Sequence, residues 1–561
     1  MEKKYILLPV ILLAGCAGFL QFGPSKPEKD LVEYQEFITK DFLFKHLSVI
    51  AADSLQGREA GMPGQKKAAQ YLSDFYSTLG MKPMGNEDFH QTFLLNAEIT
   101  DSLVYQAYRI DGMDTLKVHH STASPSSSAE FLRLFGGSVP LNGRVVFAGF
   151  GVNDEEREVT HLTGTEMAGK WVLVFNEIPH VVEGDTLINP GITNSSRIST
   201  ILNRLNAEGI LVITDEASES FNRKAEIAST LIDKPLNMRL KYLDDSTSAS
   251  GYPKGFMQIS PTMAVEMLGL ESREDLNQLR EKTTRNIREF EPFDLDYLLE
   301  YDPYMGTREI ESENVVAMIE GSDPEVREEV VVLMAHYDHI GITQPDESGD
   351  RINNGADDNG SGTVALMSVA NALAKAAEEG VRPKRSVLFL HVSAEEKGLL
   401  GSRYYSDHPA IPIEQTVTNF NADMIGRSDS RNLEKGDSDY VYIIGGDIIS
   451  AELDSLVHVA NDESVNLRLD YHYNDLQDPN QFYRRSDHWN FGRLGVPFVF
   501  FFTGVHEDYH QPSDHVEKVD LPKLTKTAGL LFSSTVKVAN YEGRPVVDNQ
   551  EFIEITKNLP R

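Results

Sequence analysis

The chain has almost no cysteine, and this scarcity excludes several kinds of site. Its 561 residues include a single cysteine, Cys16. One thiol cannot close an internal disulfide bond, and it cannot supply a metal site built on several thiolates. Because Cys16 lies near the N-terminus, the body of the chain also has no cysteine nucleophile. A metal site in this protein would therefore use imidazole and carboxylate ligands.

Positive charge is also scarce. The chain has 52 Lys and Arg residues against 86 Asp and Glu, which gives a formal net charge of -34 at pH 7. This charge repels a phosphate backbone, so we expect no nucleic acid partner. An acidic excess is compatible with cation binding, but it is also typical of a soluble surface that resists aggregation. Charge alone therefore does not identify a metal enzyme.

The N-terminal apolar segment is too short to cross a membrane. Lys3 and Lys4 precede an apolar run over residues 5–13, whereas a spanning helix needs roughly 20 residues. A short apolar run after positive charge is typical of a secretory signal. Residues 13–16, Leu-Ala-Gly-Cys, resemble the lipobox of bacterial lipoproteins, in which cleavage precedes the cysteine and the thiol receives lipid. The alternative is a plain signal peptide with an incidental cysteine.

The lipobox resemblance implies a location as well as a modification. We expect a signal peptide over residues 1–15, lipidation of Cys16 and an irregular tether over residues 16–29. The protein would then be exported and held on the periplasmic side or the cell surface of a bacterial membrane by its N-terminal lipid only. The choice between inner and outer membrane stays open.

The length of the chain exceeds that of one compact domain, so we expect two. Apolar residues spaced over 64–79 predict a helix that packs on a core and is stopped by Gly80. Residues 168–175 and 204–213 resemble strands of the protease-associated domain, a small β-rich module inserted into some peptidases. The expected organisation is a main domain over residues 30–115 and 301–545, interrupted by a protease-associated domain over 116–265 and a charged helical linker over 266–300, with a tail over 546–561.

Histidines and carboxylates follow four apolar segments in residues 301–545 of the main domain. Each segment is a continuous apolar run, which is typical of a buried strand. The segments and the residues after them are 330–334 with His336 and Asp338, 387–392 with Glu395 and Glu396, 417–420 with Asp423, and 496–502 with His506, His510 and His515. Asp357 and Asp358 lie in a Gly- and Asn-rich loop, where Ser361 is placed to cap a helix that starts at Gly362.

These clusters are far apart in the sequence but should meet in space. Loops at the carboxyl ends of strands in an open α/β sheet form one crevice. Imidazole and carboxylate without thiolate suit Zn²⁺, and two ions about 3.5 to 4 Å apart need a carboxylate that bridges them. One of the two loop aspartates would be that bridge. Each cluster alone also fits a surface turn or helix start, so the joint pattern carries the prediction.

With these motifs, the chain resembles the co-catalytic zinc peptidases that include bacterial leucyl aminopeptidase, aminopeptidase S and aminopeptidase Y. The resemblance covers residues 30–115 and 300–545. It implies an α/β fold in which helices sandwich a mixed β-sheet, of the zinc aminopeptidase-like, phosphorylase/hydrolase-like type, with the smaller protease-associated domain inserted. It also implies two Zn²⁺ ions per chain.

The resemblance assigns roles to individual residues. The implied metal ligands are His336, Asp358, Glu396, Asp423 and His510. Asp358, directly before Asn359, corresponds to the bridging ligand, so Asp357 is not one. Asp338 would orient His336, and Glu395 would be the general base. Tyr483, three residues before Ser486, corresponds to a tyrosine that steadies the oxyanion, although the aromatic pair at 482–483 also fits apolar packing. Supporting roles fall to His339, Asp487, His488 and His515.

The activity implied is hydrolysis at the N-terminal end of peptides by a metal-activated water. Peptides are then the expected partners, and the oligomeric state stays open. A carboxypeptidase or dipeptidase of the glutamate carboxypeptidase type is one alternative, and a glutaminyl cyclase with a single zinc is another. A non-catalytic binding protein on the same fold, comparable to transferrin receptor, is the third, but such relatives lose ligands that this chain retains.

Overall fold

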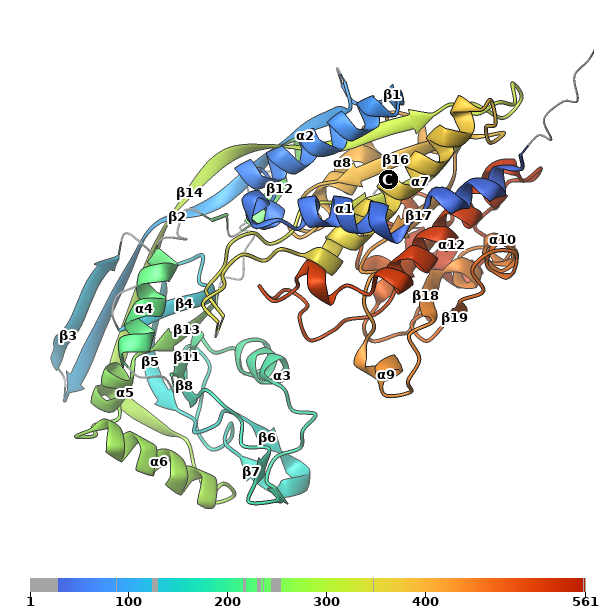
Figure 1. The fold of residues 1–561 in the computed structure, drawn as a ribbon. Coiled ribbons are helices and arrows are strands. Elements are labelled where there is room, and N and C mark those ends of the chain that lie inside the picture. Colours follow the sequence, from blue (N-terminus) through green and yellow to red (C-terminus); the bar gives the residue numbers. More distant parts are fainter. Residues whose placement is uncertain are drawn as a thin grey trace, which may run out of the picture.

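The computed structural model describes residues 29–557 and 559, except 87, 113, 124–129, 215–217, 230–233, 236, 244–253 and 347. The predicted signal peptide, Cys16 and most of the tether lie outside the described residues. No helix among the described residues is long and apolar enough to cross a membrane. The chain forms a large lobe (residues 29–89 and 320–557) and a small lobe (residues 112–292), joined by a long two-stranded arm (Figure 1).

The large lobe is built on a mixed sheet. Its strands lie side by side in the order β19 (Arg468–Asp470), β18 (Tyr440–Gly445), β20 (Phe498–Phe502), β17 (Thr416–Ala422), β15 (Val330–His336), β16 (Ser386–Val392) and β14 (Phe293–Ile319). The neighbours β20, β17, β15 and β16 are parallel, whereas β18 and β14 run antiparallel to them. All residues of β15, β16, β17 and β20 are buried, which explains their continuous apolar sequences.

Helices cover both faces of this sheet. Alternate residues of β15 point to opposite faces, so Val331 packs with one set of helices and Val332 with the other. One face carries α1 (Lys40–Ile50), α2 (Pro63–Thr78), α7 (Gly362–Glu378) and α12 (Leu521–Asn540), and the other carries α8 (Leu400–Asp407) and α11 (Trp489–Gly492). The predicted α/β fold with a mixed sheet between helices is therefore confirmed.

The predicted helix over residues 64–79 is α2, which begins at Pro63 and ends at Thr78. Its buried residues include Ala68, Leu72 and Tyr76, spaced to form one helical face. Gly80 follows with a φ of 64°, a left-handed conformation that ends the helix and that glycine adopts without a steric clash because it has no Cβ atom.

The small lobe is itself an α/β unit. Its central strands are parallel and run in the order β5 (Leu141–Phe147), β8 (Trp171–Phe175), β11 (Gly209–Ile213) and β13 (Gly255–Ile259), with β4 (Phe131–Gly136) antiparallel at the edge. The segments 168–175 and 204–213 contain β8 and β11, which pair directly. Helices α3 (Asn194–Ser199), α4 (Ser218–Ser229), α5 (Pro261–Met267) and α6 (Arg273–Arg285) surround these strands (Figure 1).

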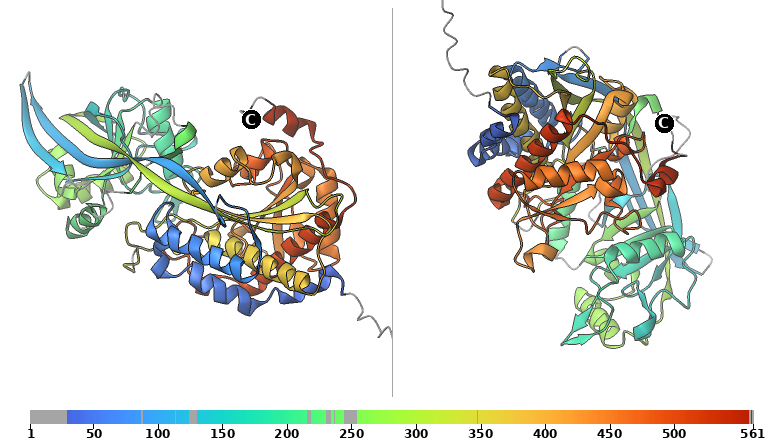
Figure 2. Two further views of the ribbon diagram at one scale, coloured as in Figure 1. Left: turned by 90° about the horizontal axis from the view of Figure 1, so that it is seen from above. Right: turned by 90° about the vertical axis from the view of Figure 1, so that its right-hand side faces the viewer.

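The arm consists of β2 (His90–Asp111) and β14, which pair antiparallel from Tyr297–Arg109 at one end to Val315–His90 at the other. Seen from above, the two strands twist around each other between the lobes (Figure 2). The predicted helical linker over 266–300 is corrected here, because residues 293–300 belong to β14 and only α6 and the end of α5 are helical. Leu295, Tyr297 and Leu299 are buried at every second position, a strand period that the charged surroundings obscure.

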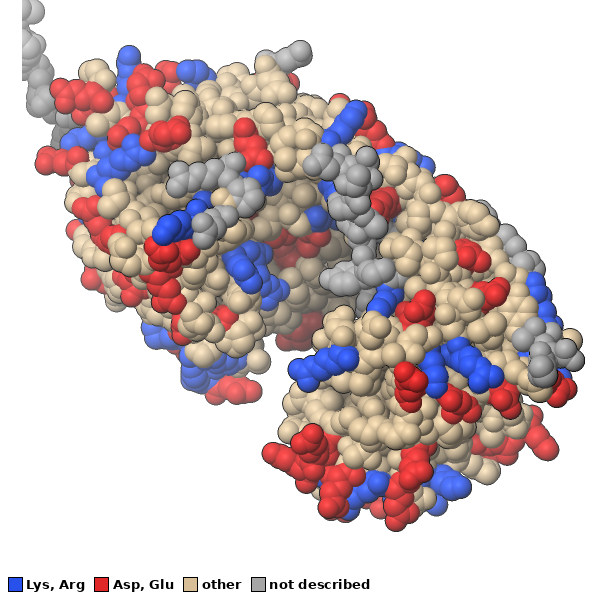
Figure 3. Space-filling model, turned by 180° about the vertical axis from the view of Figure 1, so that it is seen from behind, with Lys and Arg blue, Asp and Glu red and all other residues tan. Residues whose placement is uncertain are grey.

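Two short strands attach to the arm. Strand β3 (Asp114–Ala123) pairs with β2 in the small lobe, and β12 (Asn237–Leu240) pairs with β2 at Leu95–Glu98. The space-filling view shows a hollow between the lobes on the face opposite to Figure 1, and Lys and Arg lie among Asp and Glu over that face (Figure 3). This intermixing is typical of a solvated surface.

Candidate metal centre

The carboxyl ends of the four parallel strands bring the predicted residues together. His336 is the last residue of β15, Asp423 directly follows β17, and Glu396 lies four residues after β16. The loop after β20 supplies His510, and the turn before α7 supplies Asp358. All five predicted ligands therefore lie at one edge of the sheet, as expected for an open α/β fold.

These five residues form two groups that share Asp358. In the first group, His336 Nε2 lies 3.3 Å from Asp358 Oδ1 and 3.3 Å from Asp423 Oδ1. In the second, His510 Nε2 lies 3.2 Å from Asp358 Oδ2 and 3.1 Å from Glu396 Oε2. Ligand atoms about 2.0 to 2.1 Å from a tetrahedral zinc ion are roughly 3.4 Å apart. Asp358 therefore offers one oxygen to each group, as a bridging carboxylate must.

His339 also lies in the second group, but with different spacing. Together with Asp358 and Glu396 it forms a compact set of potential ligand atoms. However, its Nδ1 is 2.7 Å from Glu396 Oε1, which is a hydrogen-bond distance and shorter than two ligands of one zinc ion would be. This geometry fits the supporting role expected for His339, in which it orients Glu396.

The site gathers buried carboxylates whose charge a bound cation would neutralise. Among the described residues, the ion pairs of Asp358, Glu396 and Asp423 involve only histidines. Burial, with the charges of nearby carboxylates, raises the pKa of Glu395 well above its usual range and that of Asp338 to about 7. Buried carboxylates without a matching positive charge are costly. Imidazole and carboxylate donors therefore fit the predicted zinc ions.

Asp338 lies beside the ligand His336 and contacts the loop that carries Glu395. Its Oδ1 accepts a hydrogen bond from the backbone N–H of Glu395 at 3.1 Å and lies 3.8 Å from His336 Nδ1. Its own backbone oxygen is 3.2 Å from that same Nδ1. Asp338 thus connects the loops after β15 and β16, which agrees with the orienting role expected for it.

Three further supporting residues were not predicted. Ser486 Oγ donates to Asp423 Oδ2 at 2.7 Å, and Asp514 Oδ2 accepts from the backbone N–H groups of Asp357 and Asp358 at 2.9 and 3.1 Å. The fully buried Arg58 donates to the backbone oxygens of Ile50, Tyr337, Asn354 and Gly355. Asp514 directly precedes His515 and Ser486 lies three residues after Tyr483, so both are close to residues that the sequence analysis named. No local pattern indicates Arg58.

The acidic and histidine residues near the site that were not expected to bind metal either contact other groups or are buried. Asp357 Oδ1 accepts from the backbone N–H of Gly426 at 2.7 Å, and its Oδ2 lies 3.3 Å from His506 Nε2. His488 packs between Phe498 and Phe500. His515 faces Asp350, and Asp487 is fully buried.

Comparison with known proteins relates part of the chain to a peptidase family. Residues 314–535, which are less than half of the chain, match the profile described as peptidase family M28. This segment is therefore similar to that family. Aminopeptidase YwaD of Bacillus subtilis is 26% identical over 224 residues, which are 39% of this chain and 43% of the relative. Leucine aminopeptidase 2 of Trichophyton equinum is 30% identical over 235 residues, or 41% of this chain and 39% of the relative.

The chain thus spans less than half the length of these curated relatives. Among solved structures, the aminopeptidase of Aneurinibacillus sp. strain AM-1 superposes with a TM-score of 0.50 at 17% identity, over 92% of this chain and 98% of that one. A zinc aminopeptidase of Bacillus subtilis also gives 0.50, at 16% identity over 91% and 98%. These likenesses concern the fold. The family match agrees with the predicted class, a metallopeptidase, whereas the number of zinc ions, the protease-associated identity of the small lobe and the lipid anchor stay predictions.

Tyr483 is not among the residues that line the cavity at the metal centre. Tyr483 is buried, and its ring packs edge-on against Trp489 at a centroid distance of 5.9 Å. The tyrosine that lines the cavity is Tyr509, whose ring stacks on His510 at 3.9 Å. The position of Tyr483 therefore favours the alternative that it serves apolar packing. Tyr509 could have been found from the sequence because it directly precedes the expected ligand His510.

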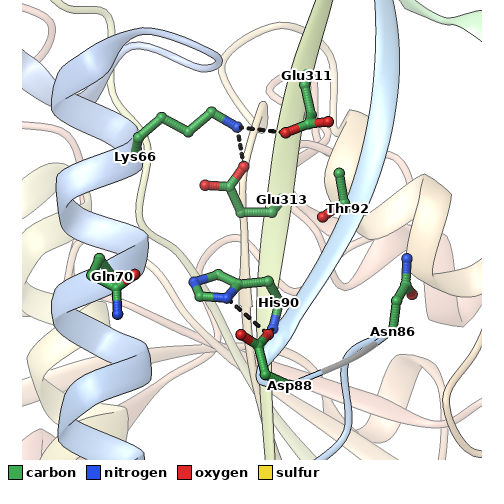
Figure 4. Close-up of a pocket in the computed structure, with 8 residues that line it drawn as sticks. All are labelled: Lys66, Gln70, Asn86, Asp88, His90, Thr92, Glu311 and Glu313. Carbon is green, nitrogen blue, oxygen red and sulfur yellow. Dashed lines mark hydrogen bonds and ion pairs between the residues drawn. The ribbon is translucent and has the colours of Figure 1, made fainter.

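The cavity at the metal centre has an apolar wall. It measures about 50 Å³, and opposite the ligands it is lined by Met424, Phe482, Phe500, Phe502 and Val505. A larger cavity, about 560 Å³, lies between α2 and the arm (Figure 4). Its lining is polar and includes the ion-paired Lys66 and Glu313, but none of the candidate ligands. The smaller cavity, which the candidate ligands line, is therefore the candidate active site.

Proposed function

We propose that this chain is an aminopeptidase that uses two zinc ions. The observation that carries the proposal is the position of Asp358, with Oδ1 beside His336 and Oδ2 beside His510. His336 and Asp423 would hold one ion, Glu396 and His510 the other, and Asp358 would bridge them. The M28 match and the aminopeptidase relatives support this assignment.

Bound zinc ions would lower the pKa of a water molecule from about 16 towards 7 and polarise the scissile carbonyl. Glu395 lines the same cavity. Bound zinc ions would keep it ionised, and its carboxylate would then accept a proton from the attacking water and return it to the leaving amine. Burial and nearby carboxylates also raise the pKa of Tyr509, so its hydroxyl stays protonated and can donate to the oxyanion.

The ligand chemistry of zinc favours the amino end of a peptide. The two ions would neutralise Asp358, Glu396 and Asp423 in the cavity, and the second ion could bind a free α-amine. A neutral amine nitrogen is a good zinc ligand, and only the N-terminus of a peptide offers one. The substrate would therefore bind by its free N-terminus rather than by its C-terminus.

The apolar wall selects the side chain of the first residue. Phe482, Phe500 and Phe502 present aromatic surface next to the ligands, with Met424 and Val505 beside them. Burying an apolar side chain against such a wall contributes roughly 1.5 to 3 kcal/mol. We propose that large apolar N-terminal residues are cleaved fastest.

The test combines metal content with the polarity of cleavage. The purified protein is analysed for zinc and incubated with an unblocked Leu-peptide and its N-acetylated twin. About two zinc ions per chain and release of Leu from the unblocked peptide alone are expected. Cleavage of both peptides from the C-terminal end would support the carboxypeptidase alternative, one zinc would favour a cyclase, and no zinc with no cleavage would favour the binding protein.

We also propose that the protein is exported and anchored by lipid on Cys16, and that the small lobe is a protease-associated domain. The lipobox resemblance and the parallel pairing of β8 with β11 support these two assignments. A Cys16→Ala variant expressed in a bacterial host should lose labelling by a radioactive fatty acid and leave the membrane fraction. Labelling that persists in the variant would contradict the anchor.

A further inference from the structure

A contact from the chain inserted between β2 and β14 reaches the loop that carries Glu396. The contact residue is Lys234, which lies just before β12. Strand β12 pairs with β2 over Leu95–Glu98, and its Met238 and Leu240 pack with Ala60 and Ala394, so this inserted segment lies against the large lobe. The loop after β15 extends from the large lobe towards the small lobe (Figure 1).

The ammonium group of Lys234 has two acceptors on the large lobe. It pairs with Glu59 Oε2 at 2.8 Å and donates to the backbone oxygen of Ile340 at 2.9 Å. The other oxygen of Glu59 accepts from Lys397 Nζ at 2.9 Å. The side chain of Glu59 is only 5% exposed, and those of Lys234 and Lys397 are 26% and 16% exposed. One buried carboxylate therefore joins the ammonium group of Lys397 to that of Lys234 in the inserted segment.

Each acceptor is connected to Glu396 through one further residue, Lys397 or His339. Lys397 is the next residue after Glu396 in the chain. Ile340 follows His339, whose Nδ1 is 2.7 Å from Glu396 Oε1. Lys234 thus restrains the two loops that fix Glu396, one through Glu59 and the other through the backbone of Ile340.

We propose that Lys234 is a positioning residue through which the inserted segment before β12 holds Glu396 in its metal-binding orientation. The inference rests on the proposed function, because it assumes that Glu396 binds zinc. Ion pairs shielded from water are stronger than exposed ones, so the Lys234–Glu59 contact can transmit a restraint. The inserted segment then contributes to the support of the metal centre, and loss of the Lys234 contacts would loosen the zinc ion held by Glu396 and His510.

The same segment provides a matched control. Lys241, seven residues after Lys234, also pairs across to the arm, with Glu309, but both side chains are 49% exposed and neither contacts a residue of the metal centre. Such an exposed pair contributes little. Lys241→Met therefore removes one lysine from the same segment without touching the proposed support.

The experiment measures zinc affinity of the full chain by competition with a chelator, together with kcat and KM on an unblocked Leu-peptide. Outer partners of metal ligands affect metal affinity or activity by 10- to 100-fold when changed. We expect Lys234→Met to weaken the binding of one zinc by about 10-fold and to lower kcat at saturating peptide. Lys241→Met should match the wild type, and in a Glu59→Gln background Lys234→Met should have a smaller effect.

The outcomes separate the inference from the proposed function. Wild-type zinc affinity in Lys234→Met would overturn the inference, as would equal losses in Lys234→Met and Lys241→Met. Wild-type protein that binds zinc without cleaving peptides would refute the proposed function alone, because zinc affinity still tests Lys234. Wild-type protein that binds no zinc would overturn both.

Discussion

Replacement of Glu395 by Gln tests the proposed chemistry most directly. The side chain lines the metal-centre cavity, and the backbone N–H of Glu395 donates to Asp338 Oδ1, a main-chain bond that the substitution keeps. Glutamine has the same shape but cannot take up a proton. We expect kcat to fall by about 10² to 10⁴, which corresponds to about 3 to 5 kcal/mol in activation free energy.

The assay compares two adjacent variants. Release of Leu from an unblocked peptide and zinc content are measured on the same samples of Glu395→Gln and Glu396→Gln. Glu396 faces His510 and should lose a zinc ion when changed, whereas Glu395→Gln should retain both. Hydrolysis at the wild-type rate with full zinc would refute the role of Glu395. Loss of zinc in both variants would make Glu395 a ligand instead.

The same variant predicts a change in stability without metal. Burial raises the pKa of Glu395, so the folded apo-protein retains a proton that the unfolded chain releases above about pH 4.3. The folded state therefore loses stability as pH rises through the window between the unfolded and folded pKa values. Metal-free Glu395→Gln should be more stable than the wild type at pH 8, as measured by urea denaturation. Equal stability would contradict the raised pKa.

Three other predictions follow from the site and the core. Asp358→Asn should lose both zinc ions, because one oxygen serves each group, and retention of either ion would contradict a bridging role. Tyr509→Phe should lower kcat by about 10²-fold with zinc unchanged, whereas Tyr483→Phe should not, and the reverse result would restore the role first expected for Tyr483. Burial lowers the pKa of His391 to about 3, so the unfolded chain takes up a proton below pH 6.5 while the folded protein does not. The free energy of unfolding of the metal-free protein should therefore fall by about 2 kcal/mol when the pH is lowered to 5. A urea denaturation series with no such loss would contradict this.

Some sequence expectations failed for identifiable reasons. Ser361 was expected to cap α7, but its hydroxyl donates to the backbone oxygen of Asp357 and accepts from the N–H of Ile425. The choice between these partners depends on the loop after β17, which is distant in sequence. The linker residues 293–300 form a strand because β2 and β5 lie on either side to pair with them.

The sequence alone determined the elements whose signal is local. A continuous apolar run specifies a buried strand wherever it occurs, and a polar residue directly after it must lie at the strand end. For this reason His336, Glu396 and Asp423 were placed correctly at one edge of the sheet. The family resemblance distinguished Asp358 from Asp357 and supplied the expected roles.

Only the tertiary structure decided which distant groups meet. Arg58 contacts the backbone of Asn354 and Gly355 almost 300 positions away, and Lys234 of the inserted segment contacts Glu59. Tyr509 in the loop after β20 lines the cavity, whereas Tyr483 packs against Trp489. Such contacts depend on the path of the whole chain, and no local periodicity or motif encodes that path.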